Sequence, residues 1–415
     1  MVTSNEAPSF TMPFDVAVYR EEFAFGIETE TMEASDGLPE VTSFNLDMID
    51  ADVPEDGEGV YVAVLDTGLL PGGWWQFFFS QANIAEDLGK GFSHDIYWDD
   101  DLQDVVIGPL YDTRGFLTKI PEGSGHGTHV TSTIVGFNVN NLYWVRGVAP
   151  KATIIPVLVL DAWKVPTPYG TLTFRGGTDE MVSAGIYYVA DLADELDGPV
   201  IISMSLGGDS PSPMIEKAID YAIKKQVIVV VAAGNAGYAG MDWPGAYPQV
   251  ISCAMAGWPE EFVSGWRGDV PEQLNTPDYW GNNWHLFLHD ISGRPNKDLG
   301  QRKWYLDVAT PGAGVVGPHK PYDSNVIGYY YAWGTSQATP HVSGIAALVL
   351  QSYPKMRQET MEDILKTAAA CLPMPSDGAL VFDIWYGLYY FEWFGGDWGN
   401  GFLQADKSLF LASLE

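Results

Sequence analysis

The segment VYVAVLDTG at residues 60–68 is a short, nearly continuous apolar run that ends in an aspartate, a threonine and a glycine. Runs of β-branched residues without polar alternation are typical of strands covered on both faces of a parallel sheet. Five further runs share this texture: TIIPVLVL (153–160), PVIISMS (199–205), VIVVVAA (227–233), VISCAM (250–255) and YLDVA (305–309). These runs together predict one buried parallel sheet.

Helical patterns alternate with these predicted strands. We expect helices at residues 126–136, 178–194, 212–225, 336–352 and 358–369. The alternation predicts a doubly wound, mostly parallel α/β sheet with helices on both faces. In such a sheet the active cleft lies at the carboxyl ends of the strands.

The composition excludes several classes of protein. The chain has 415 residues and a net charge of −33, from 54 acidic and 21 basic residues. Phosphate backbones and anionic lipid surfaces repel such a chain, so we expect neither nucleic-acid nor membrane partners. With 46% apolar and 18% charged residues, it is not a mostly disordered polyelectrolyte. No run of about 18 apolar residues predicts a membrane span, and no signal peptide is visible in the first twenty residues.

Three segments place a polar residue among small residues, where a predicted strand ends or a predicted helix begins. They are Asp66 in VAVLDTG (62–68), His126 in GHGTHV (125–130) and Ser336 in GTSQATPHVSGIAALVL (334–350). A serine hydroxyl becomes a good nucleophile when an imidazole takes its proton, and a carboxylate fixes the tautomer of that imidazole. The three residues therefore predict a nucleophile, a general base and an orienting acid.

A fourth residue, Asn235, follows the predicted strand in VVVAAGNAG (229–237). Its carboxamide, together with the backbone N–H of Ser336, is a candidate donor to the oxyanion of an acyl-transfer reaction. Each of the four residues alone is common in structural roles. Their order along the chain and their glycine-rich contexts, taken together, indicate catalysis.

These motifs, in this order, resemble those of the subtilase (subtilisin-like) family of serine proteases. Four more segments share the likeness: RGVAPKATIIPVLVL (146–160), ISMSLGG (202–208), WPGAYPQVIS (243–252) and WGNGFLQADKSL (398–409). The resemblance covers roughly residues 45–415, which we expect to form a subtilisin-like peptidase domain after an acidic extension at residues 1–44. Three segments interrupt the family pattern as insertions, near residues 70–122, 258–303 and 372–398.

The resemblance implies a serine endopeptidase that acts through an acyl-enzyme intermediate. In it Ser336 attacks, His126 is the general base and acid, Asp66 orients the ring and Asn235 donates to the oxyanion. It also implies polypeptide substrates, no catalytic cofactor and an extracellular location. An inhibitory propeptide is an expected partner that is not visible in this chain.

The resemblance also implies residues that bind the substrate. Ser205, Leu206, Gly207 and Gly208 resemble the edge on which a peptide adds as a strand, and Ala232, Ala233 and Gly234 resemble one wall of the pocket for the residue before the scissile bond. Asp242 belongs to a region that lines this pocket in relatives, and it is a candidate for favouring a basic residue there.

Alternatives remain open for the function and for two histidines. A processing or exopeptidase role, with insertions blocking part of the cleft, is one rival, and an interaction protein on a protease fold is the other. Ser205 and Ser336 each lack a glycine of the GxSxG elbow, which excludes lipases and esterases of the α/β-hydrolase fold. The HExxH zinc pattern is missing around His129, so we interpret His129 as a residue that packs or supports the site, and His341 as structural.

Metal binding and disulfide formation also stay open. The acidic cluster Asp99, Asp100, Asp101 and Asp104 lacks the glycine and glutamate of an EF-hand. A solvated acidic loop is favoured there, with structural calcium as the alternative. Cys253 and Cys371 form one bridge or stay as two thiols.

Aromatic residues are concentrated in three runs within the insertions. We interpret them as satellite packing, with a cleft rim for a hydrophobic peptide as the alternative. The first run is Trp74, Trp75, Phe77, Phe78 and Phe79; the second is Trp258, Trp266, Trp280 and Trp284; the third is Trp385, Tyr386, Tyr389, Tyr390, Phe391, Trp393 and Phe394.

The residue after the predicted nucleophile is Gln337, whereas the family usually has methionine there. A thioether beside the active serine is open to oxidation to the sulfoxide. We therefore expect peptidase activity to survive peroxide in the natural chain and to be lost quickly in Gln337→Met. Residual activity after timed peroxide treatment of both proteins tests this, and rapid inactivation of the natural chain would contradict it.

Overall fold

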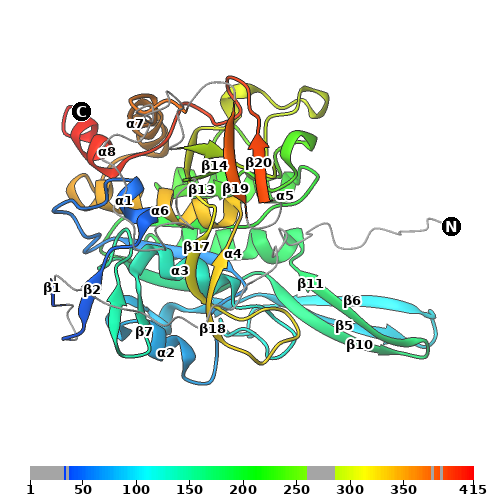
Figure 1. Cartoon of the computed structure of the whole chain (residues 1–415). Coiled ribbons are helices and arrows are strands. Elements are labelled where there is room, and N and C mark those ends of the chain that lie inside the picture. The colour runs from blue at the N-terminus through cyan, green and yellow to red at the C-terminus, as the bar shows by residue number, and fades with distance from the viewer. Residues whose placement is uncertain (1–31, 34–36, 259–285, 375–377, 384–386) are drawn as a thin grey trace.

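The computed structural model describes residues 32–33, 37–258, 286–374, 378–383 and 387–415 (Figure 1). Most of the predicted acidic extension, at residues 1–44, lies outside the described residues. So do residues 259–285 of the 258–303 insertion. Of the residues in the three predicted aromatic runs, Trp266, Trp280, Trp284, Trp385 and Tyr386 also lie outside the described residues.

The core of the molecule is an eight-stranded, mostly parallel sheet, as predicted. Its parallel strands run in the order β14, β13, β12, β3, β9 and β4, and β14 also pairs with parallel β16 and antiparallel β15. Their bounds are β3 Tyr61–Asp66, β4 Lys90–Gly91, β9 Thr153–Leu158, β12 Val200–Met204, β13 Ile228–Ala232, β14 Ile251–Gly257, β15 Phe287–Leu288 and β16 Val308–Pro311.

The five predicted helices are all present, with ends within two residues of the expected ones. They are α3 His126–Val135, α4 Asp179–Leu192, α5 Pro213–Lys224, α6 Thr335–Ser352 and α7 Gln358–Ala370. The hydroxyls of Thr178 and Ser212 begin α4 and α5 by accepting hydrogen bonds from N–H groups of the first turn.

Helices cover both faces of the sheet. The pair α3 and α6 packs together, and so does the pair α4 and α5. Ser203 of β12 is paired in register with Val64 of β3 and contacts α6 through Ser343. Leu65, the next residue of β3, contacts α4 at Gly185 instead. Because consecutive side chains of a strand point to opposite faces, α6 and α4 lie on opposite sides of the sheet.

One predicted strand begins later than expected. The run at 305–309 becomes β16 only from Val308, because Lys303–Tyr305 form a 3₁₀ turn. Asp307 then turns its carboxylate toward β14, where Oδ2 accepts a hydrogen bond from Ser252 N at 2.8 Å.

Smaller elements surround the sheet. Two hairpins, β5–β6 and β10–β11, project together as an arm on one side of the molecule (Figure 1). The remaining elements are β1 Met32–Glu33, β2 Pro39–Val41, α1 Phe44–Met48, α2 Trp74–Phe78, β5 Ser93–Asp99, β6 Asp104–Tyr111, β7 Phe137–Val139, β8 Tyr143–Val145, β10 Asp161–Thr167, β11 Gly170–Gly176, β17 Val315–His319, β18 Gly328–Ala332, β19 Ala379–Asp383, β20 Gly387–Phe391 and α8 Ala405–Ala412.

The two cysteines are not bridged. Cys253 is buried in β14 and Cys371 is exposed after α7, so the disulfide alternative is wrong. Within the described residues, no helix combines the length and the hydropathy that a membrane crossing requires.

Candidate active site

Three neighbouring strands of the sheet end in the residues on which the site is built. Asp66 is the last residue of β3, Ser205 directly follows β12, and Asn235 lies three residues beyond the end of β13. Since β3, β12 and β13 are parallel neighbours, their carboxyl ends meet at one edge of the sheet. This edge is where open α/β sheets bind ligands.

Helix α3 begins against the end of β3. The His126 ring donates from Nδ1 to Asp66 Oδ1 at 2.8 Å, with Oδ2 at 3.0 Å. Asp66 is fully buried and its Oδ1 also accepts the Thr67 N–H at 2.6 Å. An ionised carboxylate can only accept, so this contact fixes the imidazole tautomer with its proton on Nδ1. The other ring nitrogen, Nε2, is then the one that can take a proton.

Helix α6 begins against the loop after β13. Asn235 Oδ1 accepts from Thr335 N at 2.9 Å and from Thr335 Oγ1 at 3.2 Å, and Gly234 N donates to Thr335 Oγ1 at 3.0 Å. Because the oxygen of the Asn235 carboxamide is engaged, its Nδ2 amino group is the part that remains to donate to a ligand. Asn235 is half-buried, so part of its side chain is accessible.

Ser336 is held at the same edge by a reciprocal pair of hydrogen bonds. Its hydroxyl donates to Ser205 O at 3.2 Å, and the Ser205 hydroxyl donates to Ser336 O at 2.7 Å. Both α3 and α6 thus begin at the carboxyl edge of the sheet and pack against each other. The structure brings Asp66, His126, Asn235 and Ser336 to one edge.

Two further histidines lie behind His126 and carry no charge. His129 Nε2 donates to Val315 O at 3.1 Å, and the His319 ring meets the His129 ring edge-on at 6.0 Å. Burial lowers the pKa of His129 and of His319 to about 3, with Coulombic contributions from neighbouring rings. Both rings are neutral at pH 7. His129 is therefore a packing residue, as expected.

His341 lies within the buried helix α6. Its Nδ1 donates to Gln337 O at 2.8 Å, so its Nε2 accepts from Asn45 Nδ2 at 2.8 Å. Burial lowers the pKa of His341 to about 4, and the ring is neutral. It connects α6 to α1, in agreement with the packing interpretation.

The residues predicted to bind substrate line this edge as well. Ser205, Leu206, Gly207 and Gly208 are buried and extend β12, and Gly208 exchanges two 2.8 Å backbone hydrogen bonds with Trp243. Ala232 is the last residue of β13, and Ala233 and Gly234 follow it.

Asp242 lies between these two segments, although it follows Gly208 by 34 residues and Gly234 by eight in the sequence. Its N–H donates to Ala233 O at 2.9 Å. A Cβ placed on Gly207 would lie 2.6 Å from the Asp242 Cβ, and one placed on Gly234 would lie 2.4 Å from its carboxyl carbon. The side chain of Asp242 therefore packs directly on both glycines.

The acidic cluster forms the turn of the β5–β6 hairpin. Asp99 Oδ1 accepts from Asp101 N and Leu102 N, both at 2.9 Å, and Asp100, Asp101 and Asp104 are exposed. In the part of the chain that the structure describes, no group of three or more His, Cys, Asp or Glu residues is arranged to hold a metal ion. The turn is closed by its own hydrogen bonds, and the choice between a solvated loop and a calcium site stays a prediction.

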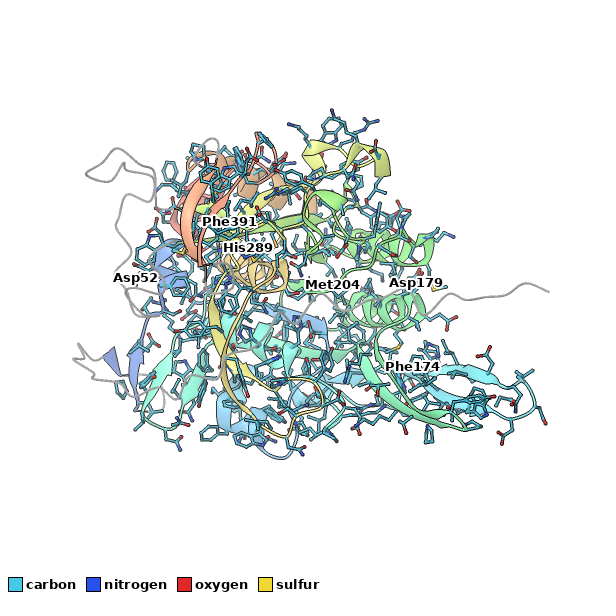
Figure 2. All side chains as sticks on the ribbon, turned by 45° about the vertical axis from the view of Figure 1, so that its right-hand side comes forward. Asp52, Phe174, Asp179, Met204, His289 and Phe391 are labelled. Atoms are coloured by element: carbon cyan, nitrogen blue, oxygen red, sulfur yellow. The ribbon has the colours of Figure 1, made fainter. Side chains whose placement is uncertain are left out.

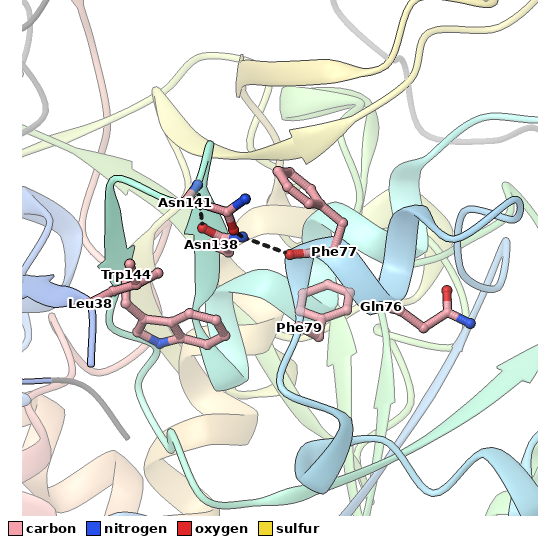
Figure 3. Close-up of a pocket in the computed structure, with 7 residues that line it drawn as sticks. All are labelled: Leu38, Gln76, Phe77, Phe79, Asn138, Asn141 and Trp144. Carbon is pink, nitrogen blue, oxygen red and sulfur yellow. Dashed lines mark hydrogen bonds between the residues drawn. The ribbon is translucent and has the colours of Figure 1, made fainter. Parts of the chain in front are cut away.

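The first aromatic run packs against the body. Trp75, Phe78 and Phe79 are buried, whereas Trp74 is 39% exposed. Phe77 and Phe79 line a small pocket together with Trp144 of β8 (Figure 3). Its other lining residues are Leu38, Gln76, Asn138 and Asn141. The backbone oxygen of Phe77 accepts a 3.0 Å hydrogen bond from Asn138 Nδ2. These contacts favour the packing interpretation.

The third aromatic run also has a packed centre. Phe391 stacks on Phe287 at 5.1 Å and lies 4.8 Å from the His289 ring, as Figure 2 shows for Phe391 and His289. Trp393 is fully buried, while Tyr390 and Phe394 are exposed.

One residue that shapes the site is not among those predicted from the sequence. Lys320 is completely buried, and its Nζ donates to the carbonyl oxygens of Pro121, Pro321 and Ser324 at 2.9–3.1 Å. Its own carbonyl accepts the Gly125 N–H at 2.8 Å, directly before His126. A single lysine in a loop almost two hundred residues from His126 carries no sequence signal for this role.

The sequence is similar to a known protein family and to characterised members of it. The sequence model of the subtilase family matches residues 57–387. Subtilisin DY of Bacillus licheniformis is 29% identical over 320 residues, which cover 76% of this chain and 85% of the relative. Thermitase of Thermoactinomyces vulgaris is 28% identical over 294 residues, which cover 71% and 76% of the two chains.

Solved structures share the fold. The S41 psychrophilic protease matches with a TM-score of 0.58 and 23% identity, over 88% of this chain and 99% of its own. Sphericase matches with a TM-score of 0.55 and 23% identity, over 89% and 94% of the two chains. The sheet and helices described above are therefore those of a known fold.

Replacing Lys320 by methionine keeps most of the aliphatic volume but removes the ammonium donors. We expect the free energy of unfolding to fall by about 3 kcal/mol, because three partly buried carbonyl groups lose charge-assisted hydrogen bonds from a fully buried ammonium. Denaturant unfolding followed by circular dichroism measures this. Lys355→Met, at an exposed lysine, is the matched control and should change stability by less than about 0.5 kcal/mol. Equal effects of the two substitutions would contradict the role of Lys320.

Proposed function

Because the chain belongs to the subtilase family and is a serine-type endopeptidase, we propose that it cleaves polypeptides with Ser336 as nucleophile. The observation that carries this assignment is the buried hydrogen bond between Asp66 and His126, at the sheet edge where Ser336 and Asn235 also lie. A carboxylate, an imidazole, a hydroxyl and a carboxamide supply the four roles that acyl transfer needs.

In the first step, the Ser336 oxygen attacks the carbonyl carbon of the scissile peptide bond. His126 Nε2 takes the hydroxyl proton as the C–O bond forms, and the ring becomes an imidazolium. Asp66 stays ionised, holds the Nδ1–H and stabilises that positive charge. Both reacting side chains come from the first turns of packed helices, which keeps them in fixed positions.

The negative charge that develops on the carbonyl oxygen needs donors. We assign Asn235 Nδ2 and the Ser336 backbone N–H to this role. Ser336 lies in the first turn of α6, where N–H groups have no acceptor within the helix. The partly positive start of the helix also favours an anion.

The second half of the reaction follows from the same groups. The imidazolium of His126 gives its proton to the departing amine, and the acyl group stays on Ser336. A water molecule then loses a proton to His126 Nε2, attacks the ester and releases the second product.

Family membership supports two wider proposals. The enzyme acts outside the cell, and an inhibitory propeptide is one of its partners. The acidic extension at residues 1–44 and structural calcium stay predictions.

Labelling with a fluorophosphonate probe tests the nucleophile. The natural chain should be labelled and should cleave peptides, whereas Ser336→Ala should do neither. Its kcat should fall by a factor on the order of 10⁶, the cost measured for such a loss in subtilisin. Ser210→Ala, at an exposed serine whose hydroxyl contacts Asp209, is the control and should behave like the natural chain. Labelling of Ser336→Ala, or failure to label the natural chain, would refute the assignment.

Replacement of Asn235 tests the oxyanion donor. In Asn235→Ala we expect kcat to fall about 10²–10³-fold with little change in KM, the cost measured for such a donor in subtilisin. Asn235→Asp keeps an oxygen to accept from Thr335 but loses the amino group, so its kcat should fall as well. Steady-state kinetics, with thermal unfolding to confirm the fold, measure both. A normal kcat in Asn235→Asp would show that only the anchoring contact matters.

A further inference from the structure

We propose that the pocket beside Ser336 selects a lysine or arginine as the residue before the scissile bond, and that Asp242 binds its positive charge. This inference rests on the proposed function, because it names the substrate class of the same site. The observations behind it are the position of one carboxylate, the absence of a cation for it and the glycines that surround it.

The position of Asp242 is set by backbone contacts on both sides. Its N–H donates to Ala233 O and its carbonyl accepts from Ala246 N, both at 2.9 Å. The next residue, Trp243, pairs with Gly208. The segment that carries Asp242 is therefore tied to the end of β13 and to the extension of β12. Ser336 is hydrogen-bonded to the start of that extension.

The side chain of Asp242 contacts a residue that is adjacent in the chain to the proposed oxyanion donor. It packs on Gly234, which precedes the oxyanion donor Asn235 and whose N–H binds Thr335 next to Ser336. A substrate whose carbonyl oxygen binds between Asn235 Nδ2 and Ser336 N holds its α-carbon beside these groups. The side chain on that α-carbon then reaches the Asp242 carboxylate. Lysine and arginine have stems long enough to bring a charge to it, and arginine can bind it with two hydrogen bonds.

Asp242 has no cation of its own. Among the residues that the structure describes, no lysine, arginine or histidine forms an ion pair with it, although sixteen other ion pairs include an acidic residue. One backbone N–H, that of Asn235, binds the carboxylate, and its charged neighbour, Asp209, is also negative. A half-buried carboxylate in this setting lowers stability unless a ligand compensates it.

The glycines on either side let the Asp242 side chain pack against bare backbone. A Cβ at Gly207 would lie 2.6 Å from the Asp242 Cβ, and one at Gly234 would lie 2.4 Å from Oδ2. Gly234 also has a φ of +92°, which favours glycine. Both walls are backbone at the point where the carboxylate lies, and Asp242 remains partly exposed to solvent.

A structural role is the competing explanation. In it, Asp242 serves only to hold Asn235 and the two glycines in place. In that case, replacing Asp242 would lower kcat/KM for all substrates alike, because the change would act on the oxyanion donor and not on the pocket. The two explanations therefore differ in which peptides a substitution affects.

The test compares peptides that differ only in the residue before the scissile bond: arginine, lysine, leucine or phenylalanine. For the natural chain, kcat/KM for arginine or lysine should exceed that for leucine by at least about 10-fold. Asp242→Asn keeps the shape and an acceptor for Asn235 N–H, and should lower the arginine value about 10²-fold while changing the leucine value less than about 3-fold. Asp209→Asn removes an exposed charge nearby and should leave the arginine-to-leucine ratio within about 3-fold.

A second readout needs no variant. Burial raises the pKa of Asp242 to about 6, assisted by Asp209 and opposed by the Asn235 N–H. The carboxyl is ionised at pH 8 and mostly protonated at pH 5, so the arginine-to-leucine ratio of the natural chain should fall across this range. Taking the ratio cancels every pH effect on the reaction that both peptides share.

Three outcomes would overturn the inference: a preference of the natural chain for leucine or phenylalanine, an equal loss on all peptides in Asp242→Asn, or a ratio that does not change with pH. Titration of Ser336 with a fluorophosphonate in each sample separates this from the proposed function. Labelled protein without basic preference contradicts only the role of Asp242, whereas unlabelled natural chain contradicts the assignment of Ser336.

Discussion

The hydrogen bond between the Asp66 carboxylate and the His126 ring is the interaction on which the rest of the site depends. Asp66 is fully buried, and a carboxylate there lowers stability unless donors satisfy its oxygens. Those donors are the Thr67 N–H and the His126 ring, so the end of β3 and the start of α3 have to meet. Gly127 permits this approach, since a Cβ there would lie 2.5 Å from Gly68 O.

A similar coupling joins the other half of the site to the fold. The Asn235 oxygen anchors Thr335 at the start of α6, and its amino group remains for the oxyanion. The helix therefore cannot shift along β13 without moving the donor and Ser336 together. The contacts that hold α6 on the sheet also set the distances on which catalysis depends, which is how a rigid scaffold organises reacting groups in advance.

Much of this arrangement was predictable from local signals. Apolar runs identified the central strands, and polar residues in glycine-rich contexts identified Asp66, His126, Asn235 and Ser336. The β10–β11 hairpin was not foreseen, because β11 is largely exposed on both faces and so carries no burial pattern. The contacts of Lys320 could not be derived either, since they depend on how a loop far along the chain returns to the sheet. For Asp242 the family resemblance indicated the pocket, but not the packing of its side chain on Gly207 and Gly234.

Lys320 and Asp242 show two ways in which this fold treats a charge removed from water. The Lys320 ammonium is fully buried and donates hydrogen bonds to three carbonyl oxygens. These acceptors within the chain compensate the cost of removing its charge from water. The Asp242 carboxylate has one backbone donor and a partly open face. If its purpose were structural, a neutral side chain of the same shape would make the same backbone contacts without the cost of desolvation. An uncompensated, partly buried carboxylate beside a reactive group is best explained by a role in function. A basic side chain of the substrate would supply the positive charge that Asp242 lacks within the chain.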